Sequence, residues 1–174
     1  LEATAWTMEK PVPYGAFHLI ATFVLLILTV FSAWRLRNAD DKANRIILGT
    51  VGGFLLLTEV YKILFHIFVN PYNWSFWGAF PFQLCSVPMY LSLFCAFCKN
   101  EKINSWLYEF MFAVNMFGAI MAFIEPSGIN HGILTLTLHA YIWHMLLIFI
   151  GLYLFMSKRA CMDKGSYKKA ITVY

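Results

Sequence analysis

Long apolar segments separated by short polar ones dominate the sequence. Five of them reach the length of about 20 residues that a helix needs to cross a membrane, and they cover residues 14–36, 46–69, 77–98, 103–124 and 133–157. This pattern predicts an all-α fold, a polytopic bundle of five spanning helices that forms one domain over residues 1–174. A signal peptide is not expected, because the first segment is long and continues into a basic stretch.

Composition supports a membrane protein and adds little else. Hydrophobic residues make up 60% of the chain and charged residues only 13%, which would leave a soluble domain with too little polar surface. The net charge of +4 predicts no nucleic-acid partner, since the basic residues lie between apolar segments, where they act as topology signals. We therefore expect a multi-pass protein of a bacterial inner membrane or an organelle membrane.

Basic residues are distributed unevenly over the connecting segments, and this distribution predicts an orientation. Three connections carry them: Arg35, Arg37, Lys42 and Arg45; Lys99 and Lys102; and Lys158, Arg159, Lys164, Lys168 and Lys169. The connections near 70–76 and 125–133 contain no Lys or Arg. The positive-inside rule then places the N-terminus outside and the C-terminus inside. An odd number of spans and an apolar stretch at 170–174 lead us to expect a further helix after this chain.

Polar side chains inside the spans are costly in lipid and usually mark functional sites. Those of this chain gather in the outer half of the predicted bilayer: His18, Glu59, Lys62, His66, Cys85, Asn115, His139 and His144. A rise of about 1.5 Å per residue places Cys85, Lys62 and His139 at one depth, on the order of 10 Å below the outer surface. The sequence therefore predicts a polar site between the helices.

Glu59, Lys62 and His66 follow one another at i, i+3 and i+7 and so project from one face of a helix. That face should point inward, where a carboxylate and an ammonium can offset each other's desolvation. Two interpretations stay open at this stage. The pair either locks helix packing or takes part in handling a substrate or a proton.

Two prolines flank a cysteine in the segment Pro81-Phe82-Gln83-Leu84-Cys85-Ser86-Val87-Pro88. Pro81 suits the first turn of a helix, and Pro88 is expected to kink or open the helix beside Cys85. A helix that begins near Pro81 would place Cys85 near its N-terminal end, where the helix dipole favours a thiolate. Cys85 is thus a candidate nucleophile, with inert packing as the alternative. The other cysteines are interpreted as packing residues: Cys95, Cys98 and Cys161.

His139 and His144 are five residues apart, about 140° around a helix, so we do not expect both to face one small ligand. One imidazole within reach of the sulfur is enough for a base that activates a thiol. A zinc or iron site built from Cys85, Glu59 and both histidines is an alternative, as is a structural hydrogen bond for each histidine. No metal and no cofactor is predicted.

Small residues in two spans predict close contacts between helices. They are Gly49, Gly52, Gly53, Gly118 and Ala122. No chemistry is assigned to them.

Five short motifs in chain order resemble the YwaF-like family of membrane proteins. They are Gly15-Ala16-Phe17-His18-Leu19, Glu59, Pro81 to Cys85, Phe117 to Ala122 leading to Pro126, and His139 to His144. The family's animal relative, transmembrane protein 164, is described as a cysteine-dependent phospholipid acyltransferase. The resemblance covers the whole chain and implies that Cys85 is the nucleophile. As its partner, His144 matches the motif better and His139 matches the depth better.

These observations lead to a first hypothesis, a membrane-embedded enzyme that transfers acyl groups between membrane lipids. Cys85 would attack an acyl ester, a histidine would move the proton, and Lys62 or Asn115 would stabilise the oxyanion. The remaining polar residues are expected to bind or polarise the substrate: Gln83, His18, His66 and Glu59. The alternatives are a small-solute or proton-coupled transporter and a non-catalytic membrane subunit, and an oligomer is compatible with each.

Overall fold

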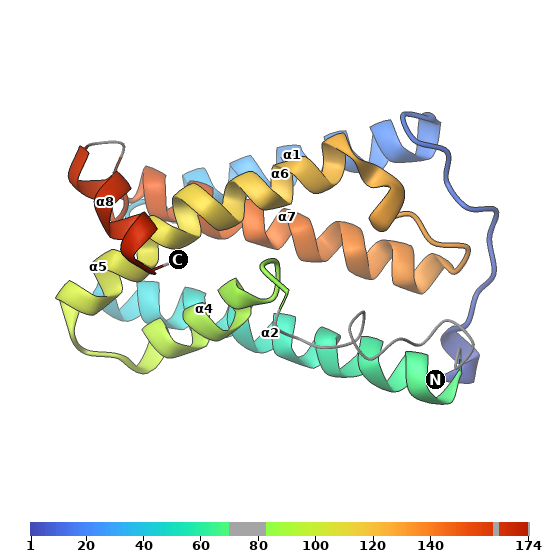
Figure 1. The fold of residues 1–174 in the computed structure, drawn as a ribbon, viewed down its shortest axis with the longest axis horizontal. Coiled ribbons are helices and arrows are strands. Elements are labelled where there is room, and N and C mark those ends of the chain that lie inside the picture. Colours follow the sequence, from blue (N-terminus) through green and yellow to red (C-terminus); the bar gives the residue numbers. More distant parts are fainter. Residues whose placement is uncertain (70–82, 162–163, 174) are drawn as a thin grey trace.

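The computed structural model describes residues 1–69, 83–161 and 164–173, which form a bundle of helices (Figure 1). Four helical segments are long and apolar enough to cross a membrane: α1 (Ala16–Leu36), α2 (Asp41–Phe68), the run Glu101–Ile124, and α7 (Leu134–Met156). The run consists of α5 (Glu101–Phe110), the π-helical turn η3 (Met111–Asn115) and α6 (Met116–Ile124). Shorter elements are η1 (Glu2–Thr4), α4 (Val87–Phe97), η4 (Pro126–Gly128) and α8 (Lys164–Val173). The described ranges contain no strand, only an isolated bridge between Thr7 and Ile133.

The all-α prediction and four of the five predicted spans are confirmed within these ranges. The third predicted span, 77–98, lies partly outside the described residues, and its described part contains the 11-residue helix α4. The expected helix from Pro81 and the kink at Pro88 are wrong. Regular helix begins at Val87, and Pro88 lies in its first turn, where a missing N–H breaks no helical hydrogen bond. Pro81 itself is outside the described residues.

The basic tail contains a helix that the sequence pattern did not predict. The buried carboxylate of Glu109 in α5 accepts hydrogen bonds from the Cys161 amide at 3.2 Å and from the Ser166 hydroxyl at 2.9 Å. It thereby fastens the start of α8 to α5. A carboxylate at a helix N-terminus is favourably placed with respect to the helix dipole.

Helix α7 is the central helix of the bundle, and most of it is buried. It packs against α1 and α6, while α2 packs chiefly against α4. Figure 1 shows α1, α6 and α7 together along one side and α2 with α4 along the other, with α5 leading from the second group into the first. The large side chains that α1 turns outward, such as Phe23, Ile27 and Phe31, are exposed, as expected for a face in contact with lipid.

The N-terminal segment crosses the end of the bundle where α7 begins (Figure 1). Its backbone is tied to the connection before α7 by Met8 N–H to Gly132 O at 3.0 Å and Leu134 N–H to Trp6 O at 2.8 Å. The buried Asn130 side chain also donates to Pro11 O at 3.0 Å. These bonds hold the connection, and with it His131, against the bundle.

Of the glycines predicted to bring helices close together, Gly52 makes the closest contact. A Cβ at this position would lie 3.0 Å from Leu93 N and 3.1 Å from Met89 O of α4. A Cβ at Gly49 would lie 3.2 Å from the Cβ of Ala96. The prediction is wrong for Gly53 and Gly118, because a Cβ on either meets no atom of the described residues within 4 Å. These two residues lie on helix faces that turn away from a neighbour.

Replacing Gly52 with Ala is expected to lower the free energy of unfolding by about 1–3 kcal/mol, because the backbones of α2 and α4 must move apart. Gly53→Ala is the matched control. It adds the same methyl group to the adjacent residue in open space and should stabilise the helix by up to about 1 kcal/mol. Thermal unfolding in one detergent measures both. Equal shifts for the two variants would show that the α2–α4 contact tolerates the methyl group.

Candidate functional site

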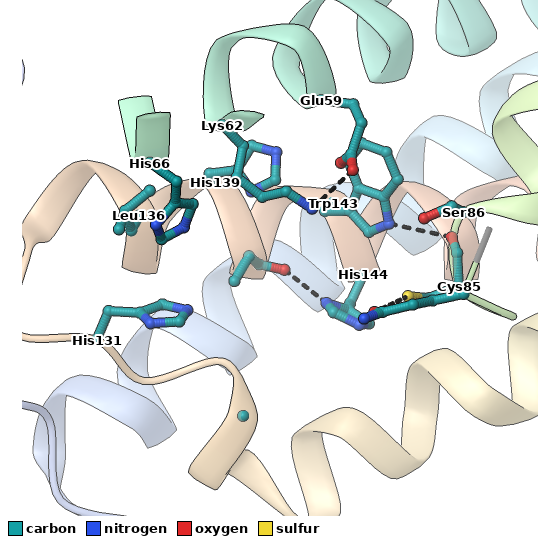
Figure 2. A pocket seen from close by; sticks show the side chains of 13 residues that line it. Glu59, Lys62, His66, Cys85, Ser86, His131, Leu136, His139, Trp143 and His144 are labelled. Carbon is teal, nitrogen blue, oxygen red and sulfur yellow. Dashed lines mark hydrogen bonds and ion pairs between the residues drawn. The ribbon is translucent and has the colours of Figure 1, made fainter. Parts of the chain in front are cut away.

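A polar cavity of about 240 Å³ lies between α2, the start of α4, the first half of α7 and the connection before α7 (Figure 2). Its lining consists of Glu59, Lys62, His66, Gln83, Cys85, Ser86, Gly128, His131, Leu136, His139, Ala140, Trp143 and His144. Seven of the nine residues predicted from the sequence are in this set. The structure therefore brings together polar groups that the sequence distributes over three separate segments.

Glu59 and Lys62 form an ion pair, with 2.7 Å between Lys62 Nζ and Glu59 Oε1. Together with His66 they line the cavity, so the prediction that all three share one inward face is confirmed. The Glu59 side chain is 3% exposed. Apart from the ion pair, its oxygens accept no hydrogen bond within the described part of the chain. A buried carboxylate of this kind depends on the ion pair with Lys62 for compensation of its charge.

Cys85 is held by two side chains that bind consecutive backbone carbonyls. Asn115 Nδ2 donates to Leu84 O at 3.0 Å, and Trp143 Nε1 donates to Cys85 O at 3.1 Å. The thiol itself lies 3.7 Å from Gln83 Oε1. Cys85 thus sits in a turn two residues before α4 begins, and it is fixed in place from both η3 and α7.

The donor that fixes Leu84 comes from an irregular part of its helix. Asn115 ends the π-helical turn Met111–Asn115, which interrupts the α-helical ladder between α5 and α6. Turns of this kind change the direction in which the following side chains point, and they are frequent at functional sites. Asn115 does not line the cavity. Its Nδ2 donates to the carbonyl of Leu84, the residue before Cys85.

His144 has one ring nitrogen in a fixed role. Its Nδ1 lies 2.8 Å from Ala140 O, and a carbonyl oxygen can only accept, so Nδ1 must carry the hydrogen. The neutral ring then keeps its lone pair on Nε2. Both His144 and Cys85 line the cavity (Figure 2). The arrangement places a thiol and a neutral imidazole in one chamber.

His139 also lines the cavity, so both histidines of α7 border one space. That they do not face one small ligand from the same side stays a prediction. The cavity extends along α7 past Leu136, Ala140 and Trp143, and two rings about 140° apart can border such a strip from its two sides. The His139 ring lies against Trp143, with 5.4 Å between ring centroids. Its buried Nε2 has no hydrogen-bond partner among the described residues.

His18 is the other predicted site residue that does not line the cavity. Its Nδ1 accepts a hydrogen bond from Tyr14 N–H at 3.1 Å. The ring is 2% exposed and meets the Tyr141 ring edge-on. This contact fits the structural alternative that the sequence left open for the histidines.

Sequence reasoning missed His131, Ser86 and Trp143. His131 lies in the connection before α7, near the outer end of the bundle on the predicted topology. The sequence also predicts a shallow depth for His66, and this similarity in depth could have indicated that His131 belongs to the same site. Burial lowers the pKa of His131, and the nearby His66 ring lowers it further. The imidazole is therefore neutral at pH 7 and can accept as well as donate a hydrogen bond.

A metal site finds no support in the described ranges, which contain no group of three or more His, Cys, Asp or Glu side chains placed to hold an ion. The alternative of zinc or iron on Cys85, Glu59 and the two histidines is not carried further. The chemistry that this cavity offers is that of a thiol, imidazoles, an ammonium and a carboxylate.

A comparison with known proteins places the chain in a family. The model of the TMEM164 family matches residues 13–174, whereas no curated protein and no solved structure gives a significant match. The family match confirms the part of the sequence resemblance that concerns transmembrane protein 164, and the wider YwaF-like grouping stays a prediction. With four candidate spans and a family match over most of its length, this chain is a multi-pass membrane protein and belongs to the TMEM164 family.

Proposed function

We propose that this protein is a thiol-dependent acyltransferase that acts on membrane phospholipids, with Cys85 as the nucleophile and His144 as its base. One observation carries the proposal: Cys85 and His144 border a single cavity, and the Nδ1 atom of His144 is occupied by Ala140 O. The free Nε2 is the atom that a general base needs. A thiol suits a site of low polarity because it is a strong nucleophile even when only a small fraction is ionised.

The reaction has two half-steps. His144 Nε2 takes the thiol proton, and the sulfur attacks the carbonyl carbon of a phospholipid ester. When the C–O bond breaks, the imidazolium returns the proton to the departing lysophospholipid alcohol, and a thioester remains on Cys85. The hydroxyl of a second lysophospholipid then attacks the thioester while His144 Nε2 takes its proton. The C–S bond breaks, and the imidazolium returns the proton to the departing Cys85 thiolate.

The contacts support a division of roles among the other polar residues. The Lys62 ammonium lines the cavity and is the candidate for stabilising the oxyanion. Asn115, the other candidate, has its donor bound to Leu84 O, so we assign it and Trp143 to positioning the thiol. Glu59 holds Lys62, whereas the cavity-lining His66, His139 and Gln83 contribute to binding the polar part of the lipid.

An apolar groove supports a lipid as the substrate. A second hollow of about 300 Å³ borders the cavity, shares His139 and Trp143 with it, and continues along Phe54, Leu138 and Ile142. Those three side chains are exposed on the outside of α2 and α7. An acyl chain lying in this groove would bring its ester to the polar cavity.

We also propose that the apolar stretch 77–98 provides a fifth crossing and that the chain runs from an outer N-terminus to an inner C-terminus. The support is the distribution of basic residues over the connections between spans, because the connections that carry Lys or Arg lie at the end of the bundle opposite the cavity. The cavity then serves lipids of the outer leaflet.

A proton-coupled transporter is the second candidate. The buried Glu59–Lys62 pair in an open polar cavity favours it, since such pairs relay protons in carriers. Uptake into proteoliposomes that survives Cys85→Ala but is lost with Glu59→Gln would support this candidate against the enzyme.

The assignment of His144 rather than His139 as the base is testable by mutation. Transfer of a labelled acyl chain from a phospholipid to a lysophospholipid by the purified protein should fall by about 10²–10⁴-fold in kcat for His144→Ala. The comparison variant His139→Ala removes the same ring from the same helix. Because His139 is assigned to lipid binding, this variant should raise KM and leave kcat within about tenfold of wild type. Absence of transfer activity in the wild-type protein would refute the function. A larger loss of kcat in His139→Ala than in His144→Ala would refute the assignment of His144 as the base.

A further inference from the structure

A second polar cavity, of about 290 Å³, lies at the end of the bundle opposite the thiol. It is bordered by the starts of α2 and α5 and by the residues that follow α7, and its charged and amide lining residues include Asp41, Arg45, Glu101, Asn104, Lys158 and Arg159. Asn44, also in its lining, is 15 residues before Glu59 on α2. That separation is about 22 Å along a helix, so the two cavities are independent sites.

The walls of this cavity are fixed by hydrogen bonds, of which the two to Asn44 are buried. Asn44 is 2% exposed; it donates to the Tyr108 hydroxyl and accepts from the Tyr153 hydroxyl, each at 2.9 Å. One amide thereby joins α2, α5 and α7. Arg159 is held at 2.7 Å by Asp41 and at 3.0 Å by Ala39 O. The cavity is therefore preorganised, because contacts within the protein hold its lining side chains in position without a ligand.

Two residues in the lining of this cavity each carry a buried polar atom with no partner within the described residues, the donor Arg159 Nε and the acceptor Asn104 Oδ1. Asn104 is 5% exposed, and its Nδ2 is occupied by Cys98 O at 3.0 Å. Leaving such an atom unpaired costs about 1–3 kcal/mol. A ligand that both accepts and donates hydrogen bonds would satisfy the two atoms at once.

The charges around the cavity indicate a phosphate as the accepting group. Arg45 and Lys158 line it in addition to Arg159, and α2 and α5 both begin at its edge. Arginine and lysine together with helix N-termini form the usual surroundings of a bound phosphate. Of the two carboxylates present, Asp41 is paired with Arg159, and Glu101 lies in the first turn of α5, next to Asn104 along the helix.

The position of the cavity along the bundle indicates which kind of ligand carries the phosphate. The cavity lies where two spanning segments begin and a third ends, and this is the depth of lipid headgroups in a bilayer. We propose that this cavity binds the headgroup of a phospholipid that carries a hydrogen-bond donor, with phosphatidylethanolamine as the best match. Its phosphate binds Arg45, Lys158 and Arg159 Nε, and its ammonium donates to Asn104 Oδ1 near Glu101.

The test titrates the purified full chain in detergent with short-chain phosphatidylethanolamine, with phosphatidylcholine and with inorganic phosphate. The trimethylated choline cannot donate, so wild-type protein should bind the ethanolamine lipid about tenfold more tightly. Asn104→Leu should remove this preference. Lys158→Gly should raise the Kd for both lipids about tenfold. Because Lys158 has a φ of 59°, a conformation that glycine adopts freely, this variant is expected to fold normally.

Lys42→Gln is the matched control, since Lys42 is an exposed cation of the same end of α2 that does not line the cavity. It should bind both lipids as wild type does. Equal affinity of wild type for the two lipids, an unchanged Kd for Lys158→Gly, or binding of inorganic phosphate without lipid would each overturn the proposal. The same titration with Cys85→Ala should give wild-type Kd values whether or not the chain is an acyltransferase.

Discussion

Replacing Cys85 with Ala is expected to abolish acyl transfer, with a loss of at least about 10³-fold in kcat. The reason is that the mechanism carries the acyl group on the Cys85 sulfur, and the Ser86 hydroxyl, which also lines the cavity, is a far weaker nucleophile than a thiol at neutral pH. The rate of labelled acyl transfer between phospholipids, measured on the purified protein, tests this expectation. Cys85→Ser, which preserves the shape of the side chain, should recover little activity because a serine hydroxyl is far harder to ionise.

Cys161→Ser is the matched control for the cysteine variants, because Cys161 is exposed and its backbone amide, not its thiol, makes the hydrogen bonds to Glu109. It should retain full activity and stability. Transfer that continues unchanged in Cys85→Ala would eliminate the covalent mechanism. Loss of activity together with a large fall in Tm for the same variant would indicate that the thiol has a packing role.

Lys62→Met is expected to destabilise the protein by about 3–5 kcal/mol, because it leaves the Glu59 carboxylate buried without its partner. The double variant Glu59→Gln with Lys62→Met removes both charges and should recover most of that stability. Thermal unfolding of the two single variants and the double variant in one detergent gives the coupling energy. Additive changes in the free energy of unfolding for the two single variants would mean that the 2.7 Å contact contributes nothing to stability.

The same set of variants separates structure from function. A pair that only locks α2 against its neighbours predicts that the double variant regains activity together with stability. Our assignment of Lys62 to the oxyanion predicts that the double variant folds but transfers acyl groups at least about 10²-fold more slowly. Measuring kcat beside Tm for this one protein distinguishes the two roles.

The spans could be predicted from the sequence because their hydrophobicity alone determines them. The inward face of Glu59, Lys62 and His66 could be predicted because helical spacing alone determines it. The surroundings of Cys85 could not be predicted in detail. The prolines suggested a distorted helix, whereas the turn before α4 depends on donors from Asn115 and Trp143, which are distant in the chain.

His131 and the second cavity were outside the reach of sequence reasoning for a similar reason. His131 joins the site only because the connection before α7 is hydrogen-bonded to the N-terminal segment. The second cavity depends on Asn44 joining three helices. A pattern along one helix carries no information about such long-range partners.

The central claim, that Cys85 acts as a nucleophile activated by His144, is tested most directly by the mass of the peptide that contains Cys85. After the purified protein is incubated with a phospholipid of known acyl chain and quenched in acid, this peptide should gain the mass of one acyl group. The gain should be removed by hydroxylamine and strongly reduced in His144→Ala. A wild-type protein that transfers acyl chains while its Cys85 peptide stays unmodified would contradict the account.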